Sequence, residues 1–167
     1  MHVEHIRQMY SYSQWAFERV WNCVRTLGDD GFAQPLNYSI GSIRSHFLHV
    51  TGVEERWFAR LNGTAVPPFP NQETFGSIEQ VYAEWSRVTQ ANLSQLARWT
   101  DEDMMREIVY DIPHRGGIKR NPMWQILVHV VNHATDHRSQ ILAGLHTLGA
   151  PTVEQDMIFY FWEQSGG

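Results

Sequence analysis

The sequence contains a single cysteine, Cys23, among 167 residues, so an internal disulfide is excluded and a reducing compartment is expected. Long apolar runs are also missing, because no stretch approaches the roughly 20 apolar residues that a membrane-spanning helix needs. The opening residues, MHVEHIRQMY, have neither a basic leader nor an apolar core, which argues against a signal peptide. These absences predict a cytoplasmic protein without a membrane partner.

Positive charge is scarce as well. Lys and Arg total 13 against 18 Asp and Glu, which gives a net charge of −5. Proteins that bind nucleic acid usually present a broad basic face, so we expect no nucleic-acid partner. Hydrophobic residues make up 43% of the chain, enough apolar surface to exclude a disordered protein. The length predicts one compact domain that spans residues 1–167.

Four stretches of the chain carry apolar residues at helical spacing. Each stretch has one apolar face, so the helices must pack against one another to be stable. The predicted fold is an all-α four-helix bundle, with a short extended piece before the last long helix and a short C-terminal helix. The long helices are expected at residues 3–27, 42–62, 77–99 and 121–148, and the short one within residues 153–164.

Local signals indicate where these elements begin. Ser77, followed three residues later by Gln80, is a capping-box pattern. Asn121-Pro122 predicts another helix start, with asparagine as the N-cap and proline at the first helical position. Ahead of it, the alternating segment REIVYD (106–111) and the loop IPHRGGIKR (112–120) predict a short strand or hairpin.

Histidine is unusually frequent, with nine copies. His133 and His137 are four residues apart in the last long helix, so they lie about 6 Å apart on one face that also carries apolar residues. His129 is rotated toward the flank. Two neighbouring buried imidazoles can share a divalent metal, with a third ligand from another helix. His49 is the best donor, and His46, which projects closer to the apolar face of its helix, is its rival.

Two motifs together resemble the DinB/YfiT-like family of metal-dependent proteins. In the second predicted helix, His49 is followed by Glu54 and Trp57, and the last long helix contains HVVNHATDHRSQ, close to the family pattern H-x3-H-x3-H-R-x-Q. The resemblance extends over nearly the whole chain. One departure is Ser139, where many members have glycine; serine is small, so we expect no change in the site.

The resemblance implies a bundle that holds one divalent metal ion through His49, His133 and His137, with His129 as a neighbour. Zinc or nickel is the most frequent metal in such proteins, and iron, cobalt or manganese are alternatives that imidazole ligands also suit. The resemblance further implies a homodimer. Characterised members of the superfamily use the metal with low-molecular-weight thiols, as S-transferases or thiol-dependent isomerases.

Three functions stay open for such a site. Three histidine ligands leave a coordination position free, which is typical of catalytic metal sites and favours a metal-dependent transferase that acts on a small thiol. The second possibility is a non-catalytic stress-response module that binds a metal or another ligand. The third is a hydrolase that uses a metal-bound water, with Glu54 and Asp136 as candidate general bases by their proximity in sequence.

Other residues carry weaker functional predictions. Asp136 is expected to face solvent rather than orient a neighbouring imidazole. Arg138 is expected at the surface, with contact to an anionic substrate as the alternative. Tyr110 and His114 are candidates for the mouth of a pocket, and Cys23 is expected to be a buried spacer. The seven tryptophans are expected to be core or dimer contacts rather than a cage for a substrate, with more than one at a subunit interface.

Overall fold

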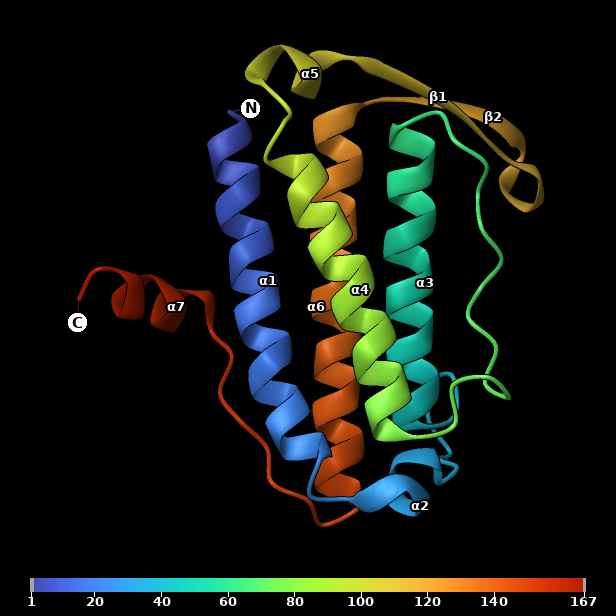
Figure 1. The fold of residues 1–167 in the computed structure, drawn as a ribbon, viewed down its shortest axis with the longest axis vertical. Coiled ribbons are helices and arrows are strands. Elements are labelled where there is room, and N and C mark those ends of the chain that lie inside the picture. The colour runs from blue at the N-terminus through green and yellow to red at the C-terminus, as the bar shows by residue number, and fades with distance from the viewer. Residues whose placement is uncertain (1, 167) are drawn as a thin grey trace.

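Four long helices stand side by side in the computed structural model, which describes residues 2–166 (Figure 1). Each of the four packs against two of the others, so each buries its apolar face on both sides. The predicted all-α fold is confirmed. The long helices are α1 (Val3–Val24), α3 (Ile43–Leu61), α4 (Ile78–Leu96) and α6 (Met123–Thr147).

Side-chain caps begin two of these helices where the sequence predicted. The Oγ of Ser42 accepts a hydrogen bond from the backbone N–H of Ser45 at 3.1 Å. Ser77 and Gln80 form the predicted capping box, in which each side chain accepts a hydrogen bond from the other residue's backbone N–H. The entries to α3 and α4 are therefore encoded locally.

The helix start predicted at Asn121-Pro122 is wrong. Both residues belong to strand β2, and α6 begins at Met123 after Pro122 in an extended conformation (φ −61°, ψ 145°). Asn121 caps nothing, because its Oδ1 accepts a hydrogen bond from the hydroxyl of Tyr110 at 2.6 Å. Pairing with the neighbouring strand thus overrides the local helix signal.

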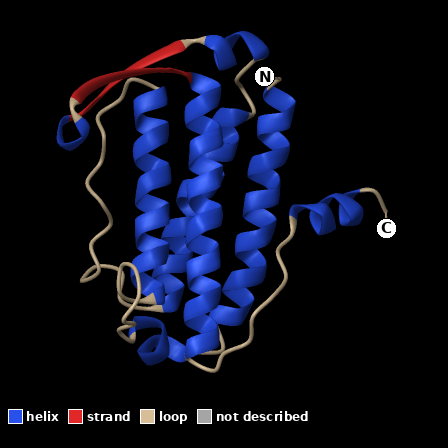
Figure 2. Cartoon of the chain, turned by 180° about the vertical axis from the view of Figure 1, so that it is seen from behind, coloured by secondary structure: helices blue, strands red, loops and turns tan. Residues whose placement is uncertain are grey.

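The extended piece is a hairpin, one of the two predicted forms: β1 (Glu107–Ile112) covers most of the alternating segment, and β2 (Gly117–Pro122), which pairs with it antiparallel, lies largely in the segment predicted as a loop. A 3-10 turn (Pro113–Arg115) joins the strands. After it, Gly116 and Gly117 have φ of 86° and 79°, a region that other residues rarely adopt. Figure 2 shows the hairpin across one end of the bundle, where α6 begins.

Two short helices were not predicted: α2 (Gly28–Ala33) and α5 (Asp101–Met105). Their six and five residues are too few to show helical spacing. The sequence does hold a start signal for α5, because Thr100 and Asp103 form a capping box. Within α2, Phe32 is fully buried.

The predicted C-terminal helix is α7 (Met157–Gln164), which projects from the bundle beside α1 (Figure 1). Tyr160 is buried against Tyr12 of α1. The indole Nε1–H of Trp15 donates to Glu163 at 2.7 Å. Among the residues the structure describes, no helix is both long and apolar enough to cross a membrane.

The two larger apolar clusters of the core lie one toward each end of the bundle, and a third, small cluster joins α1 to α7. In the cluster near α2, Trp21 stacks on Phe47 with 3.7 Å between ring centres. In the cluster near the hairpin, Phe58 stacks on Trp99 at 5.5 Å. Buried polar side chains of α1 and α4 separate the clusters: Ser13, Thr89 and Asn92.

Candidate metal centre

Three histidines converge between α3 and α6. His49 projects from α3, His133 and His137 project from α6, and one ring nitrogen from each lies within 4.8 Å of the other two. The helical spacing of four residues puts both α6 imidazoles on one face, and α3 packs against it. The structure therefore brings together the three residues that the family resemblance implies as ligands.

The spacing of these nitrogens fits a divalent metal. Imidazole nitrogens bind zinc at about 2.0–2.1 Å, so two of them in a tetrahedral site lie about 3.3 Å apart. Nε2 of His49 and Nε2 of His133 are 3.2 Å apart. The nitrogen of His137 lies within 4.8 Å of both, a distance that rotation of an imidazole can close.

The histidine cluster is neutral at physiological pH. Burial and the neighbouring imidazoles lower the pKa of His133 from its ordinary value of 6.5 to about 3. The same two causes lower the pKa of His49. Burial also lowers the pKa of His137, although the charge of Asp136 and a hydrogen bond with Gln140 oppose it. Neutral imidazoles keep their lone pairs free for a metal, so no proton has to leave before an ion binds.

His46, the rival ligand, contacts the cluster from the other side of His137. Its Nδ1 lies 3.0 Å from Nδ1 of His137, so one of the two nitrogens donates a hydrogen bond to the other. His46 is fully buried, and its Nε2 has no hydrogen-bond partner within residues 2–166. With Nδ1 of His137 occupied in this way, Nε2 of His137 is the nitrogen left for an ion.

His129 lies beside the cluster, as predicted. Its ring is exposed and is 6.0 Å from the ring of His133. The indole of Trp57 meets it at 5.6 Å with the two rings nearly perpendicular. His129 therefore joins the wall of a neighbouring pocket rather than the group of three converging histidines.

The loop between α3 and α4 covers one side of His49. Phe69 stacks on the imidazole with 5.7 Å between ring centres and 10° between ring planes. Phe69 also contacts Arg56, whose guanidinium lies over the Phe69 ring at 4.6 Å from its centre. Gly52 makes room for this arrangement, because a Cβ there would lie 2.6 Å from Phe69 Cδ1. A cavity of about 220 Å³ beside Phe69 opens onto His49.

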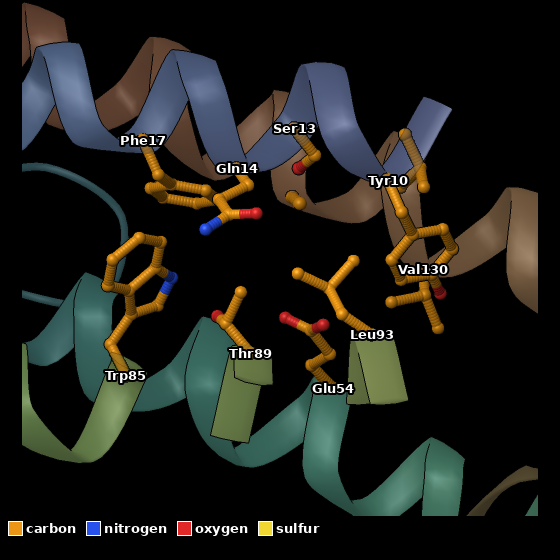
Figure 3. Close-up of a pocket in the computed structure, with 11 residues that line it drawn as sticks. Tyr10, Ser13, Gln14, Phe17, Glu54, Trp85, Thr89, Leu93 and Val130 are labelled. Atoms are coloured by element: carbon orange, nitrogen blue, oxygen red, sulfur yellow. The ribbon is translucent and has the colours of Figure 1, made fainter. Parts of the chain in front are cut away.

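Glu54, a candidate general base, points into a different pocket. Figure 3 shows its carboxyl group among Thr89 and Leu93 in the interior of the bundle, facing α1. Burial raises the pKa of Glu54 from 4.5 to about 7, although a hydrogen bond from Asn92 at 3.2 Å opposes the shift. Glu54 is therefore close to half-protonated at neutral pH, and the structure does not place it among the converging histidines.

Two minor predictions are confirmed. Asp136 is exposed on the solvent side of α6. Cys23 is buried in the apolar cluster near α2, and burial raises the pKa of its thiol. Neither residue takes part in the site, and the raised pKa makes Cys23 a poor nucleophile.

The prediction for Arg138 is wrong in both of its forms. The side chain is fully buried and reaches neither solvent nor an open pocket. Its guanidinium donates four hydrogen bonds, to Tyr12 Oη, Ser13 Oγ, Thr135 Oγ1 and Gln155 Oε1. Arg138 thereby links α6, α1 and the segment before α7, a structural role that its position beside His137 in the sequence does not reveal.

The two residues proposed for a pocket mouth have different surroundings. Tyr110 faces a pocket of about 270 Å³, where its ring is 5.0 Å from that of Trp57. His114 is exposed in the 3-10 turn of the hairpin and does not line this pocket. Of the two, only Tyr110 is near the histidine cluster, because it lines the same pocket as His129, the neighbour of His133.

The tryptophans divide between the core and the surface. Trp21 and Trp85 are buried, whereas Trp162 on α7 is 56% exposed. Four others are partly buried: Trp15, Trp57, Trp99 and Trp124. Trp21 and Trp85 are thus core residues, one of the two places expected, and a subunit interface stays a prediction.

Comparison with known proteins agrees with the fold and with the family that the sequence resembles. The DinB family profile matches residues 1–166. Protein DinB of Bacillus subtilis (strain 168) is 23% identical over 162 residues, which cover 93% of this chain and 92% of that protein. The crystal structure of a DinB-like protein from Bacillus cereus ATCC 10987 has a TM-score of 0.68, with 19% identity and coverage of 92% of this chain and 98% of that one. The chain described here belongs to the DinB family.

Proposed function

We propose that His49, His133 and His137 hold one divalent metal ion, zinc or nickel, and that the protein is a metal-dependent enzyme acting on a small thiol. The convergence of three imidazole nitrogens within 4.8 Å of one another is the observation that supports this proposal most strongly. Iron, cobalt and manganese are the alternative ions for such ligands.

The composition of the site favours catalysis over a structural role. Structural zinc sites are usually closed by four protein ligands, whereas catalytic sites have three and an open position. An ion held by three neutral histidines would keep its full charge. It would then act as a Lewis acid and lower the pKa of a thiol in the open coordination position. In the transfer itself, the thiol proton goes to water, the sulfur forms a bond to an electrophilic carbon, and the leaving group departs with its bonding electrons.

The protein supplies orientation and shielding around the open position. His46 fixes the ring of His137 through the Nδ1 contact of 3.0 Å. Phe69 covers one face of His49 and limits the access of water there. The cavity of about 220 Å³ next to Phe69 is large enough for a small thiol to approach.

Turnover of a thiol and monochlorobimane by metal-loaded protein tests this function. We expect thioether formation that a chelator abolishes and added zinc or nickel restores. His137→Ala should lose the activity, and His146→Ala, which changes an exposed histidine of the same helix, should keep it. Metal binding without turnover of any thiol would instead favour the non-catalytic binding module.

A hydrolytic function receives less support. A metal-bound water needs a nearby general base. Glu54 has a suitable pKa of about 7, but its carboxyl group faces the interior pocket and Asn92. Asp136 is exposed on the solvent side of α6.

We further propose a cytoplasmic homodimer without a nucleic-acid or membrane partner. The exposed Trp162 of α7 and the partly buried Trp15 of α1 are the indoles that a second copy would cover. Light scattering across micromolar concentrations tests the dimer. A constant mass of 19.4 kDa, that of one chain, would refute it.

A further inference from the structure

A second pocket lies next to the histidine cluster, on the side away from Phe69. It has a volume of about 270 Å³ and lies between the hairpin, α3 and α6. Its lining combines aromatic rings with side-chain amides: Trp57, Tyr110, His129, Asn121, Gln125 and Ile126. Cavities of about 150 Å³ already accept benzene, so this one has room for a substituted aromatic ring.

Two aromatic rings of this pocket stand nearly perpendicular to the Trp57 indole. Tyr110 meets Trp57 at 5.0 Å and 84°, and His129 meets the same indole at 5.6 Å and 81°. A planar ligand ring in this pocket can therefore pack against more than one aromatic surface, in offset or edge-to-face contact. Saturated rings of the same size lack the electrostatic part of that attraction.

A chain of hydrogen bonds fixes the polar side of the pocket. The hydroxyl of Tyr110 donates to Asn121 Oδ1 at 2.6 Å, and Asn121 Nδ2 donates to Gln125 Oε1 at 2.8 Å. In this arrangement the Nε2 amide group of Gln125 is available to donate a hydrogen bond to a ligand. The pocket is thus suited to a ligand with an acceptor oxygen on its ring, such as a carbonyl or nitro group.

The pocket and the candidate metal centre share a wall. His129 lines the pocket, and its ring is 6.0 Å from that of the candidate ligand His133. A ring bound against Trp57 and Tyr110 would therefore lie one side chain away from the candidate ligand His133.

From this arrangement we infer that the Trp57–Tyr110–His129 pocket binds a planar aromatic molecule with an acceptor oxygen. Its role as the site of the electrophilic co-substrate rests on the proposed function, whereas aromatic binding itself needs no metal. In that role, the thiol sulfur forms a bond to the electrophilic carbon, the leaving group departs as an anion, and the thiol proton goes to water.

Binding to metal-free protein tests the pocket without any activity. The probes are benzamide and cyclohexanecarboxamide, which have the same amide group but differ in the aromatic ring. We expect benzamide to bind about fivefold tighter or more, because an aromatic contact adds roughly 1 kcal/mol. It should shift the NMR signal of the Trp57 indole N–H and leave that of Trp162 in place. Equal binding of the two probes, or no shift at Trp57, would overturn the inference.

Variants assign the binding to named side chains. Tyr110→Ala should remove the preference for benzamide, and Tyr110→Phe, which keeps the ring, should retain most of it. Gln125→Glu replaces the free donor by an acceptor on an exposed position of α6, so it should weaken benzamide binding and keep the fold. Trp162→Leu, which removes an exposed indole of α7, is the matched control and should bind as the native protein does. Unchanged benzamide binding in Gln125→Glu and Tyr110→Ala would overturn the assignment.

A kinetic experiment separates the pocket from the proposed function. Metal-loaded protein is given a thiol with either chlorodinitrobenzene, an aromatic electrophile that loses chloride, or iodoacetamide, a non-aromatic one that loses iodide. Gln125→Glu should raise KM for the first and leave that for the second unchanged. Benzamide binding without turnover of either would refute the transferase and keep the aromatic site, and turnover without benzamide binding would refute the site alone.

Discussion

Nδ1 of His46 lies 3.0 Å from Nδ1 of His137, in the buried space between α3 and α6. This contact engages Nδ1 of His137 and leaves Nε2 as the nitrogen available to an ion. It also explains why His46 and His49 were hard to rank from the sequence: both reach the cluster, one through His137 and the other directly. His46 is therefore a positioning residue in this account.

Replacing His46 should weaken metal binding without removing it. His46→Leu loses the partner of His137, and the loss of such an orienting hydrogen bond typically lowers metal affinity about 10- to 100-fold. His46→Asn keeps a polar atom near the position of Nδ1 and should recover most of that loss. Competition titration with a metal indicator measures both affinities. If His46→Leu binds zinc as tightly as the native protein, the positioning role is wrong.

A methyl group at Gly52 should uncover His49. The Cβ of Gly52→Ala would lie 2.6 Å from Phe69 Cδ1 and 2.7 Å from Pro70 Cδ, so the loop has to move away from α3. The ring-current shift that Phe69 imposes on the His49 imidazole protons should then disappear from the NMR spectrum. Gly76→Ala is the matched control, because its Cβ would meet nothing closer than 3.8 Å. Identical His49 signals in Gly52→Ala and the native protein would contradict this packing.

Glu54 should make the protein less stable as the pH rises. Its pKa is about 7 in the folded protein against an ordinary value of 4.5, so the folded state keeps a proton that the unfolded state has released between these values. The free energy of unfolding therefore falls as the pH rises through this window, by on the order of 3 kcal/mol for a shift of this size.

Glu54→Gln, which mimics the protonated acid and keeps a partner for Asn92, should remove this dependence. Urea unfolding of both proteins at about pH 4.5 and about pH 8 measures the difference, and the contribution of the histidines cancels between them. The variant should be the more stable protein at the higher pH and nearly equal at the lower one. A difference that does not change with pH would show that Glu54 ionises normally.

Arg138 should matter for stability and not for substrate binding. Arg138→Leu leaves Ser13 and Thr135 without their donor inside the protein, and should lower the free energy of unfolding by about 3 kcal/mol. In conditions where the variant is folded, its KM for an anionic substrate should equal that of the native protein. A raised KM with unchanged stability would restore the substrate-binding role.

The sequence predicted the helices well where the signal was long and failed where it was short. The periodic stripes of α1, α3, α4 and α6 extend over 19 to 25 residues, so chance spacing has little effect on them. The local signal at Asn121-Pro122 competed with strand pairing, a contact between distant residues that local patterns do not encode. The five and six residues of α5 and α2 offered no period to detect.

The candidate site was predictable in part, for the same physical reason. The spacing of His133 and His137 on one helix fixes their common face, and the motif pointed to His49 as their partner. Packing decides the rest. Phe69 reaches His49 from an irregular loop, and Gly52 admits it only because of the close approach of that loop to α3. Arg138 follows His137 directly in the sequence and yet faces α1, since consecutive helical residues point in different directions.

Elemental analysis of purified protein measures whether His49, His133 and His137 hold a metal ion. The native protein, His49→Ala, His133→Ala, His137→Ala and the control His146→Ala are each loaded with zinc or nickel and freed of excess metal by gel filtration. We expect about one ion per chain in the native protein and the control, and a large loss in each of the three other variants. A full complement of metal in His49→Ala, His133→Ala or His137→Ala, with the fold intact by circular dichroism, would contradict this expectation.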